Sequence, residues 1–193
     1  YFSGRMNYSA SEENYIKSIY HLQQQAETVT TNSLANELQT RAASVTDMLK
    51  KLHLKKLLEY EKYKGFRLNA SGNKVALNIV RRHRLWEYFL VTKLGFEWEK
   101  VHAIAEELEH VSSMELIEKL DVFLNHPQTD PHGDPIPDMH GKLPVIRQVS
   151  IADVPVKKNV KSPAFANLPV YISYTFIKFT LSRVSTSQGF DLM

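Results

Sequence analysis

The first third of the chain places apolar residues at the spacing of short amphipathic helices, then changes to the period-two spacing of strands. Ser9-x-x-Glu12 has the form of a capping box, so a helix is expected to begin there. A tight turn through 39–41 separates the next two helical stretches. The predicted elements are helices from Ser9 to about Gln25, from Thr30 or Thr31 to Leu38 and over about 43–56, and hairpin strands at 58–61 and 66–68. This order predicts a winged helix-turn-helix.

The middle of the chain has longer helical stretches, with breaks at small and polar residues. Helices are predicted from about Ser71 to Leu94, from about Glu97 to Val111, and from Ser112 or Ser113 to about Leu124. Gly95 is expected to end the first of them as the residue after the C-terminus. Prolines and glycines then predict an irregular connection up to Pro144. The Val-, Ile-, Phe- and Tyr-rich remainder predicts a small β unit.

Four segments follow from these breaks. Residues 1–8 are interpreted as a tag remnant and N-terminal arm, because YFSGRM has the appearance of a cleaved tag followed by a vector scar. Residues 9–70 form the predicted winged helix, 71–143 a helical unit and 144–193 the β unit. Among the 193 residues there is no cysteine, which excludes disulfides, thiolate zinc sites and a cysteine nucleophile. The sequence contains no apolar run long enough to span a membrane, and a cytoplasmic protein is expected.

Charge divides along the same boundaries. Residues 41–67 carry an excess of Lys and Arg, whereas 71–143 carry an excess of Asp and Glu. In a helix-turn-helix the second helix places its N-terminal residues near base edges, and a basic wing contacts phosphates. The predicted base-proximal residues are Arg41, Ala43, Ser44, Thr46 and Asp47, and the predicted phosphate contacts are Lys62, Lys64 and Arg67. Among them, Arg41 has the side chain best suited to a bidentate base contact.

The acidic unit contains a second pattern. The stretch VHAIAEELEHV, residues 101–111, puts two histidines and two glutamates on one helical face: His102, Glu106, Glu109 and His110. His83 and Glu87 repeat the i, i+4 spacing on the preceding helix. Imidazole and carboxylate ligands suit divalent first-row metals. The spacing alone leaves two other interpretations open, solvent-exposed helix pairs and a di-iron carboxylate bundle.

The di-iron interpretation depends on Glu107-x-x-His110, but that architecture needs a second Glu-x-x-His segment on a facing helix, and the sequence contains none on another predicted helix. A Gly-rich phosphate loop and a Gly-x-Ser-x-Gly elbow are also absent from the sequence. No enzymatic activity is therefore expected. His126, His132 and His140 lie in the proline-rich connection and are expected to be ordinary exposed histidines.

Several stretches together carry a family resemblance over about residues 9–143. They are SEENYIKSIYHL, TTNSLANELQTRAASVTDMLKKL, LLEYEKYKGFRLNASG, VRRHRLWEYFL, EKVHAIAEELEHV and GDPIPD. The chain resembles the diphtheria-toxin-repressor family of metal-dependent transcriptional regulators. The resemblance implies a mainly α fold with an N-terminal winged helix-turn-helix, a helical dimerisation domain and a small C-terminal SH3-like β domain. With about fifty residues, the C-terminal unit is expected to be an incomplete SH3-like domain.

The resemblance also implies metal ligands. His83, Glu87 and His102 match the family's ancillary site, here called the ancillary cluster. Asn14, Glu106, Glu109 and His110 match the primary site, here called the primary cluster. Glu106 in place of the iron type's cysteine favours Mn²⁺ or Fe²⁺ over thiophilic metals. One helical turn after Asn14, where the manganese type has a glutamate, this chain has Lys17. The lysine is expected to repel a second cation.

The function implied by the resemblance is that of a metal-activated DNA-binding repressor of metal-uptake genes. Mn²⁺ or Fe²⁺ is the expected cofactor, and Zn²⁺, Co²⁺ or Ni²⁺ can substitute in vitro. Double-stranded operator DNA and a second copy of the chain are the expected partners, with no membrane. Because metal-binding histidines must be neutral, activation is expected to weaken at acid pH. The alternatives are a di-iron oxidase or metal-storage helical protein, and a winged-helix protein under some other control.

Overall fold

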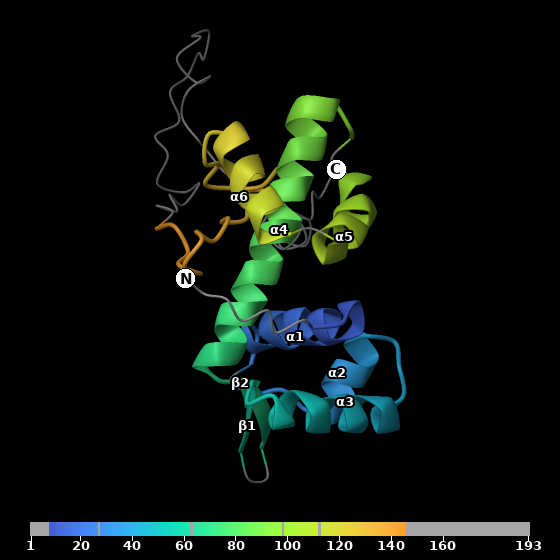
Figure 1. Cartoon of the computed structure of the whole chain (residues 1–193). Coiled ribbons are helices and arrows are strands. Elements are labelled where there is room, and N and C mark those ends of the chain that lie inside the picture. Colours follow the sequence, from blue (N-terminus) through green and yellow to red (C-terminus); the bar gives the residue numbers. More distant parts are fainter. Residues whose placement is uncertain (1–7, 27, 62–63, 98, 112, 146–193) are drawn as a thin grey trace, which may run out of the picture.

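The computed structural model describes residues 8–26, 28–61, 64–97, 99–111 and 113–145. Within these ranges the elements are α1 (Ala10–Gln23), α2 (Thr31–Glu37), α3 (Ala42–Leu54), β1 (Leu58–Glu61), β2 (Gly65–Leu68), α4 (Ala70–Leu94), α5 (Val101–Val111) and α6 (Met114–Phe123). The long helix α4 runs through both halves of the molecule. Its first turns lie beside α1 and the β1–β2 hairpin, and its later turns lie between α5 and α6 (Figure 1).

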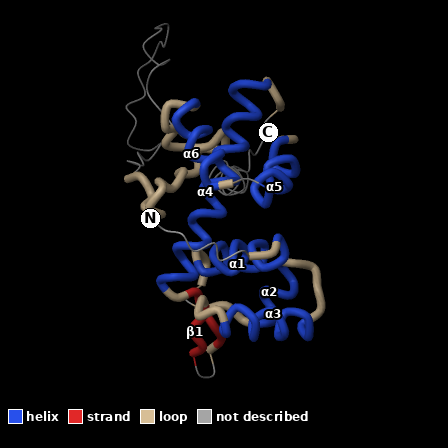
Figure 2. The backbone as a smooth tube through the Cα atoms, in the orientation of Figure 1, coloured by secondary structure: helices blue, strands red, loops and turns tan. Residues whose placement is uncertain are grey.

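The N-terminal half is the predicted winged helix-turn-helix. Helices α1 to α3 and the hairpin surround one apolar core, whose most buried members include Ile16, Ile19, Leu34, Val45 and Leu52. The two strands pair antiparallel with Leu58 opposite Leu68 (Figure 2). The first turns of α4 join the same core through Ala76 and Ile79. Helix α3, the β1–β2 hairpin and the start of α4 are therefore packed into a single body.

Local sequence explains where these helices begin. The Ser9–Glu12 capping box is present, with Ser9 Oγ accepting from the Glu12 amide at 3.2 Å. Thr30 caps α2 in the same way, although its partner at the third helical position is Ser33 rather than an acid. An unpredicted cap at Asn69 starts α4, and its side chain accepts from the Gly72 amide at 2.9 Å. These side chains satisfy amides that have no partner within the helix.

Most boundaries differ from the sequence prediction by one or two residues, and the start of α5 differs by more. The helix predicted from about Glu97 begins only at Val101, because Glu97–Lys100 close a turn in which the Lys100 amide donates to the Glu97 carbonyl at 2.9 Å. The prediction was wrong by about one turn. The second strand begins at Gly65, one residue earlier than predicted. Gly65 has φ +135° and lies so close to the Val29 carbonyl that a Cβ would stand 2.3 Å from its oxygen, so glycine is required there.

The second half packs helices on both sides of α4. Leu85 meets Ile117 and Leu120 of α6, while Leu90 meets Val101 and Ala105 of α5. Gly95 ends α4 in the left-handed conformation, as predicted, with φ +70°. Downstream of α6, residues 125–145 form the expected irregular connection. The predicted β unit lies outside the described residues, and the division into domains at 70 and 143 remains a prediction.

A search of the described residues finds no helix with the length and apolar character needed to cross a membrane.

Candidate metal centre and DNA-binding surface

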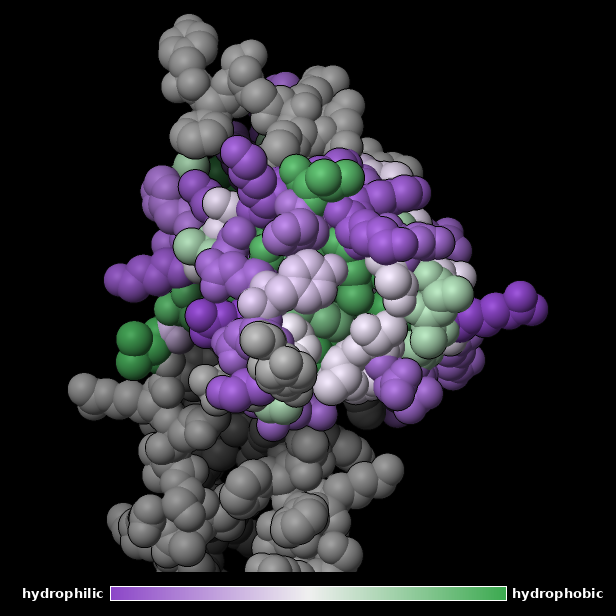
Figure 3. Space-filling view, turned by 90° about the horizontal axis from the view of Figure 1, so that it is seen from below, coloured by the Kyte–Doolittle hydropathy of each residue, from purple (hydrophilic) through white to green (hydrophobic). Residues whose placement is uncertain are grey.

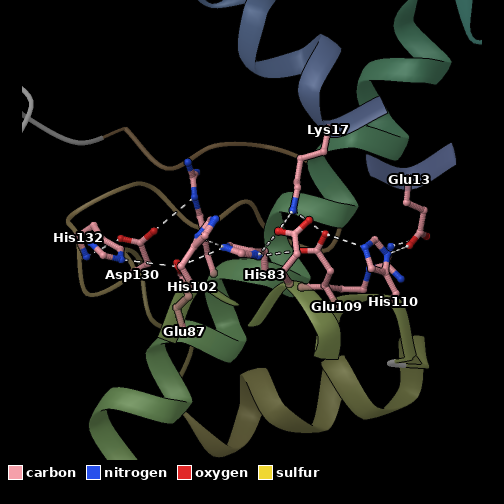
Figure 4. A network of polar contacts seen from close by, with 12 residues as sticks. Glu13, Lys17, His83, Glu87, His102, Glu109, His110, Asp130 and His132 are labelled. Carbon is pink, nitrogen blue, oxygen red and sulfur yellow. Dashed lines mark hydrogen bonds and ion pairs between the residues drawn. The ribbon is translucent and has the colours of Figure 1, made fainter. Parts of the chain in front are cut away.

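The predicted metal ligands meet where α1, α4 and α5 face one another. Helix α4 contributes His83 and Glu87, which are four residues apart and therefore on one face. Helix α5 contributes its own polar face from His102 to His110, while its apolar residues Val101 and Ala105 pack toward Leu90 of α4. Helix α1 lies across the top of this arrangement (Figure 4). Packing of the apolar faces thus brings the two sequence patterns together.

Lys17 on α1 reaches into the centre of the cluster. Its Nζ lies 2.5 Å from Glu106 Oε2 and 2.7 Å from Glu109 Oε1. The lysine side chain is 11% exposed and that of Glu109 is fully buried. Burial would raise the pKa of Glu109, but its hydrogen bond to His83 and the Lys17 charge together lower it below its usual range. The two carboxylates are therefore compensated by a cation that belongs to the chain itself.

His83 connects the two clusters. Its Nδ1 lies 2.6 Å from Glu109 Oε2, and its Nε2 lies 3.1 Å from Glu87 Oε1 and 3.0 Å from His102 Nδ1. Burial opposes the charged ring, but the hydrogen bonds to Glu109 and Glu87 prevail and raise the pKa of His83 to about 9. With carboxylates at both nitrogens the ring has the environment of an imidazolium. If His83 is a metal ligand, as predicted, metal binding there would have to release a proton.

Glu87 is the buried acceptor of the ancillary cluster. Its Oε1 also lies 3.2 Å from His102 Nδ1. Burial would raise the pKa of Glu87, but hydrogen bonds from His102 and His83 lower it to about 2. His132 Nε2, from the loop after α6, lies 3.7 Å from the same carboxylate oxygen. The prediction that His132 is an ordinary exposed loop residue was therefore wrong, since it lines a pocket together with His83, Glu87 and His102.

The loop that carries His132 is fastened to α4. Asp130 is 4% exposed and accepts from the amides of His132 and Asp134, each at 2.9 Å. Its Oδ2 also lies 3.5 Å from Nε of Arg84. Burial nevertheless raises the pKa of Asp130 to about 6. These contacts hold the His132 ring at the mouth of the pocket. His126 and His140, in contrast, are exposed.

His110 is held by a residue that the sequence analysis did not single out. Its Nδ1 lies 2.7 Å from Glu13 Oε2 on α1, and the other Glu13 oxygen accepts from Arg82 at 2.6 Å. A ring that donates from Nδ1 leaves Nε2 with its lone pair. This Nε2 is buried and, among the described residues, has no hydrogen-bond partner. A carboxylate behind a histidine is the usual support of a metal-binding imidazole.

The donor atoms of the primary cluster suit a divalent ion. Asn14 Oδ1 on α1 is also buried and has no hydrogen-bond partner within the described ranges. Ligand atoms of Glu106, Glu109 and His110 lie within 4.8 Å of one another, and so do those of His83, His102 and Glu106. Buried polar atoms are rarely left without a partner. Two such atoms, an amide oxygen and an imidazole nitrogen, together with two carboxylates, fit the donor preferences of Mn²⁺ and Fe²⁺.

Six of the seven predicted ligands thus lie in one region, and the seventh, Asn14, lies on α1 one turn before Lys17, but the division between the clusters is less sharp than predicted. Glu106 belongs to both groups of potential ligands. Three supporting residues were missed or misjudged, namely Glu13, Arg82 and His132. Glu13 and Arg82 could not have been identified from the sequence, because nothing in a helix sequence shows which carboxylate will lie behind a histidine on another helix. Their roles as ligands or supports remain predictions.

The predicted base-proximal residues lie at the start of α3 and are accessible. Arg41, Ala43, Ser44, Thr46 and Asp47 are all exposed, whereas Val45 and Leu49 on the other face are buried. Thr46 Oγ1 donates to the Ala42 carbonyl at 2.9 Å, which leaves the hydroxyl oxygen available as an acceptor. Figure 3, seen from the α3 side, shows a mainly hydrophilic face with a smaller apolar area.

The wing differs from a simple basic hairpin. Arg67 lies 3.2 Å from Glu59 and 3.5 Å from Glu61, and Lys64 lies 3.8 Å from Glu61. Lys62 lies outside the described residues. Exposed ion pairs of this kind are weak, so a phosphate can compete for the arginine. Whether these three residues contact DNA remains a prediction.

Comparison with known proteins identifies the family. The chain matches the family model of the iron dependent repressor N-terminal DNA binding domain over residues 7–66, and that of the iron dependent repressor metal binding and dimerisation domain over residues 69–138. It is 34% identical over 120 residues to the HTH-type transcriptional regulator MntR of Oceanobacillus iheyensis, covering 62% of this chain and 81% of that protein. The chain belongs to the iron-dependent repressor family.

Other members of the iron-dependent repressor family match it over part of their length. The iron-dependent repressor IdeR of Mycobacterium leprae is 33% identical over 127 residues, which are 66% of this chain and 55% of IdeR. The chain therefore spans about half the length of IdeR. A solved manganese-dependent transcriptional repressor in complex with manganese has a TM-score of 0.64 and 39% identity, covering 70% of this chain and 62% of that structure.

Proposed function

We propose that this member of the iron-dependent repressor family is a cytoplasmic DNA-binding repressor that controls metal-uptake genes. Its affinity for operator DNA is set by Mn²⁺ or Fe²⁺. The observation that carries the proposal is the meeting of α1, from the winged helix, with α5 at a cluster of metal-binding side chains. Two buried atoms of the predicted ligands, Asn14 Oδ1 on α1 and His110 Nε2 on α5, are without hydrogen-bond partners among the described residues.

The primary cluster joins the two halves of the molecule. Asn14 belongs to α1, whose residues Ile16 and Ile19 lie in the same core as Val45 and Leu52 of α3. Glu106, Glu109 and His110 belong to α5 instead. A bound divalent ion would supply positive charge shared by donors on both helices. The position of α1 on α5 then determines the position of α3, because α1 and α3 share one core.

The repressor is proposed to act as a homodimer. Paired recognition helices must be spaced to meet successive major-groove faces of the DNA. Exposed apolar side chains for such an interface are present on α6, where Val122 is 62% and Phe123 60% exposed. Metal and DNA would favour the same arrangement of the two α3 helices, and each would tighten binding of the other. Sedimentation at micromolar concentration should give twice the monomer mass.

The direct test is a metal series of DNA binding. A duplex is first selected from a random library by the Mn²⁺-loaded protein, and its binding is then followed by fluorescence anisotropy with Mn²⁺, Fe²⁺, Zn²⁺ and Co²⁺ under anaerobic conditions. Affinity should rise about 5- to 150-fold with Mn²⁺ or Fe²⁺, as expected for a coupling of 1–3 kcal/mol. Equal affinity with and without every metal would reject the proposal.

The alternative of a di-iron oxidase or storage protein is disfavoured by one side chain. Glu107, on which the Glu-x-x-His110 pattern depends, is exposed on α5, whereas that architecture needs its glutamates directed into the bundle. Incubation with Fe²⁺ in air distinguishes the two functions. A repressor should bind iron reversibly, and sustained O₂ consumption would instead support the oxidase.

We further propose that His132 completes the ancillary cluster from the loop after α6. Replacing His132 by alanine should weaken metal binding there about tenfold, within the range for partners of a metal site, because a nitrogen close to Glu87 is removed. Competition with a metal-sensitive dye measures the change. His126→Ala is the matched control, since His126 is exposed and pairs with Asp121. Equal affinities in the two variants would exclude His132 from the site.

A further inference from the structure

The position of Lys17 has a consequence for how metal enters the primary cluster. Its ammonium contacts Glu106 Oε2 at 2.5 Å and Glu109 Oε1 at 2.7 Å. Both carboxylates are proposed metal ligands, and Lys17 lies on α1 with Asn14, one helical turn away. The ammonium therefore joins the same two helices that a metal ion is proposed to join.

Because both are positively charged, the Lys17 ammonium and a divalent metal ion are alternatives at these two carboxylates. Glu109 Oε2 is engaged by His83, and its Oε1 is the oxygen that faces both Lys17 and, at 3.6 Å, His110 Nε2. A divalent ion bound to Glu109 Oε1 and His110 Nε2 would lie within a few ångströms of the lysine charge. Repulsion between two positive charges at such a distance is strong in a buried site. The ammonium and the ion cannot both keep these carboxylate contacts.

We propose that Lys17 is a tethered cation that holds Glu106 and Glu109 in the metal-free protein, and that its ammonium has to leave these carboxylates before a divalent ion can use them. The inference extends the proposed function and rests on it. Lys17 then raises the metal concentration at which the repressor is activated. It also gives the second oxygen of buried Glu109 a partner in the metal-free protein, beside the contact of His83 with the first.

Removal of the charge should tighten metal binding. Lys17→Met keeps the length and apolar stem of the side chain but deletes the competing ammonium, and Mn²⁺ affinity should increase about tenfold or more, the usual size of a coupling between two ligands. Binding is measured from the free Mn²⁺ signal in electron paramagnetic resonance, in a His102→Ala background that removes the ancillary cluster. An unchanged or weaker affinity in the Lys17→Met variant would overturn the inference.

A matched control is a lysine at the C-terminal end of α3 that pairs with the same helix α1. Lys55 makes a comparable ion pair with Glu12 of α1, with Nζ 2.7 Å from Glu12 Oε1, and neither residue is a proposed ligand. Lys55→Met removes a lysine–glutamate pair of the winged helix without altering the metal cluster. Its Mn²⁺ affinity should equal that of the parent. An equal gain in both lysine variants would mean that the effect comes from general loss of positive charge, and would also overturn the inference.

A second measurement uses the protein without substitution at Lys17. An amine-acylating reagent followed by mass spectrometry reports the reactivity of each lysine. Lys17 should react slowly without metal and several-fold faster with saturating Mn²⁺, because its ammonium has left the carboxylates. Equal or slower reaction with metal would contradict displacement. If neither the parent nor the Lys17→Met variant binds Mn²⁺, the proposed function itself fails, which is distinct from binding with equal affinity in both.

Discussion

Replacement of His110 by alanine is expected to abolish metal-dependent DNA binding. The substitution removes the buried Nε2 that faces the primary cluster and releases Glu13 from its contact at 2.7 Å. Loss of an outer-shell partner alone costs about 10–100-fold in metal affinity, and loss of a direct ligand should exceed that range. Anisotropy titrations of the selected duplex with Mn²⁺ should show no metal response up to millimolar concentration, with metal-free binding unchanged.

Two features make this test specific to the primary cluster. His126→Ala should retain the full response, because the His126 side chain is 65% exposed and pairs with Asp121 rather than with a predicted ligand. Thermal unfolding of the metal-free His110→Ala protein should show the variant folded at the assay temperature. A full Mn²⁺ response in the His110→Ala variant would remove His110 from the site and leave the ancillary cluster as the only candidate regulator.

Glu13→Ala is expected to have the second largest effect, although Glu13 is not a proposed ligand. The carboxylate orients His110 through Nδ1 and pairs with Arg82, whose side chain is only 12% exposed. Metal affinity should fall about 10–100-fold, as for other supports of metal-binding histidines. Stability should also fall by about 3–5 kcal/mol, the usual effect of removing one partner of a buried ion pair. Dye competition and thermal unfolding measure the two effects separately.

The neighbouring residue separates orientation of the histidine from general damage to α1. Glu12 caps α1 and pairs with Lys55, on the opposite side from the metal cluster. Glu12→Ala should lower stability while metal affinity stays constant. Glu13→Gln should recover part of the affinity, because an amide oxygen can still accept from His110 Nδ1. If Glu12→Ala and Glu13→Ala weaken metal binding equally, the carboxylate of Glu13 has no particular role.

The fold was largely predictable because its signals are local. Capping at Ser9 and Thr30, and the left-handed Gly95, each depend on residues within one turn. The start of α5 was predicted too early, since Glu97 and Lys100 are ordinary helix formers and only the chain reversal after Gly95 makes them a turn. Each helix and strand within the described residues was predicted as the correct type, and the errors lie at the boundaries of these elements. At a boundary the local sequence is compatible with helix or turn, and tertiary packing decides between them.

The site was predictable as a set of ligands but not as a network. Spacing alone places His83 with Glu87, and the four polar residues of α5 on one face. The contacts of Lys17, Glu13 and His132 are tertiary, linking residues 89 to 97 positions apart for α1 and α5. Lys17 illustrates the difference. Its charge predicted repulsion of a second cation, whereas the structure places that charge on the carboxylates of the primary cluster.

The shared core of α1 and α3 sets how far a regulatory signal has to travel. The metal cluster touches one side of α1, and the other side packs through Ile16 and Ile19 into the core that holds α3 (Figure 1). The proposed metal site and the proposed DNA-binding helix α3 are thus separated by little more than the thickness of one helix, about 10–12 Å. Helix α4 passes unbroken through both halves, so a continuous helix connects them. If metal binding shifts α1 at the cluster, α3 would move with it as part of the same packed core, without loop rearrangement or local unfolding.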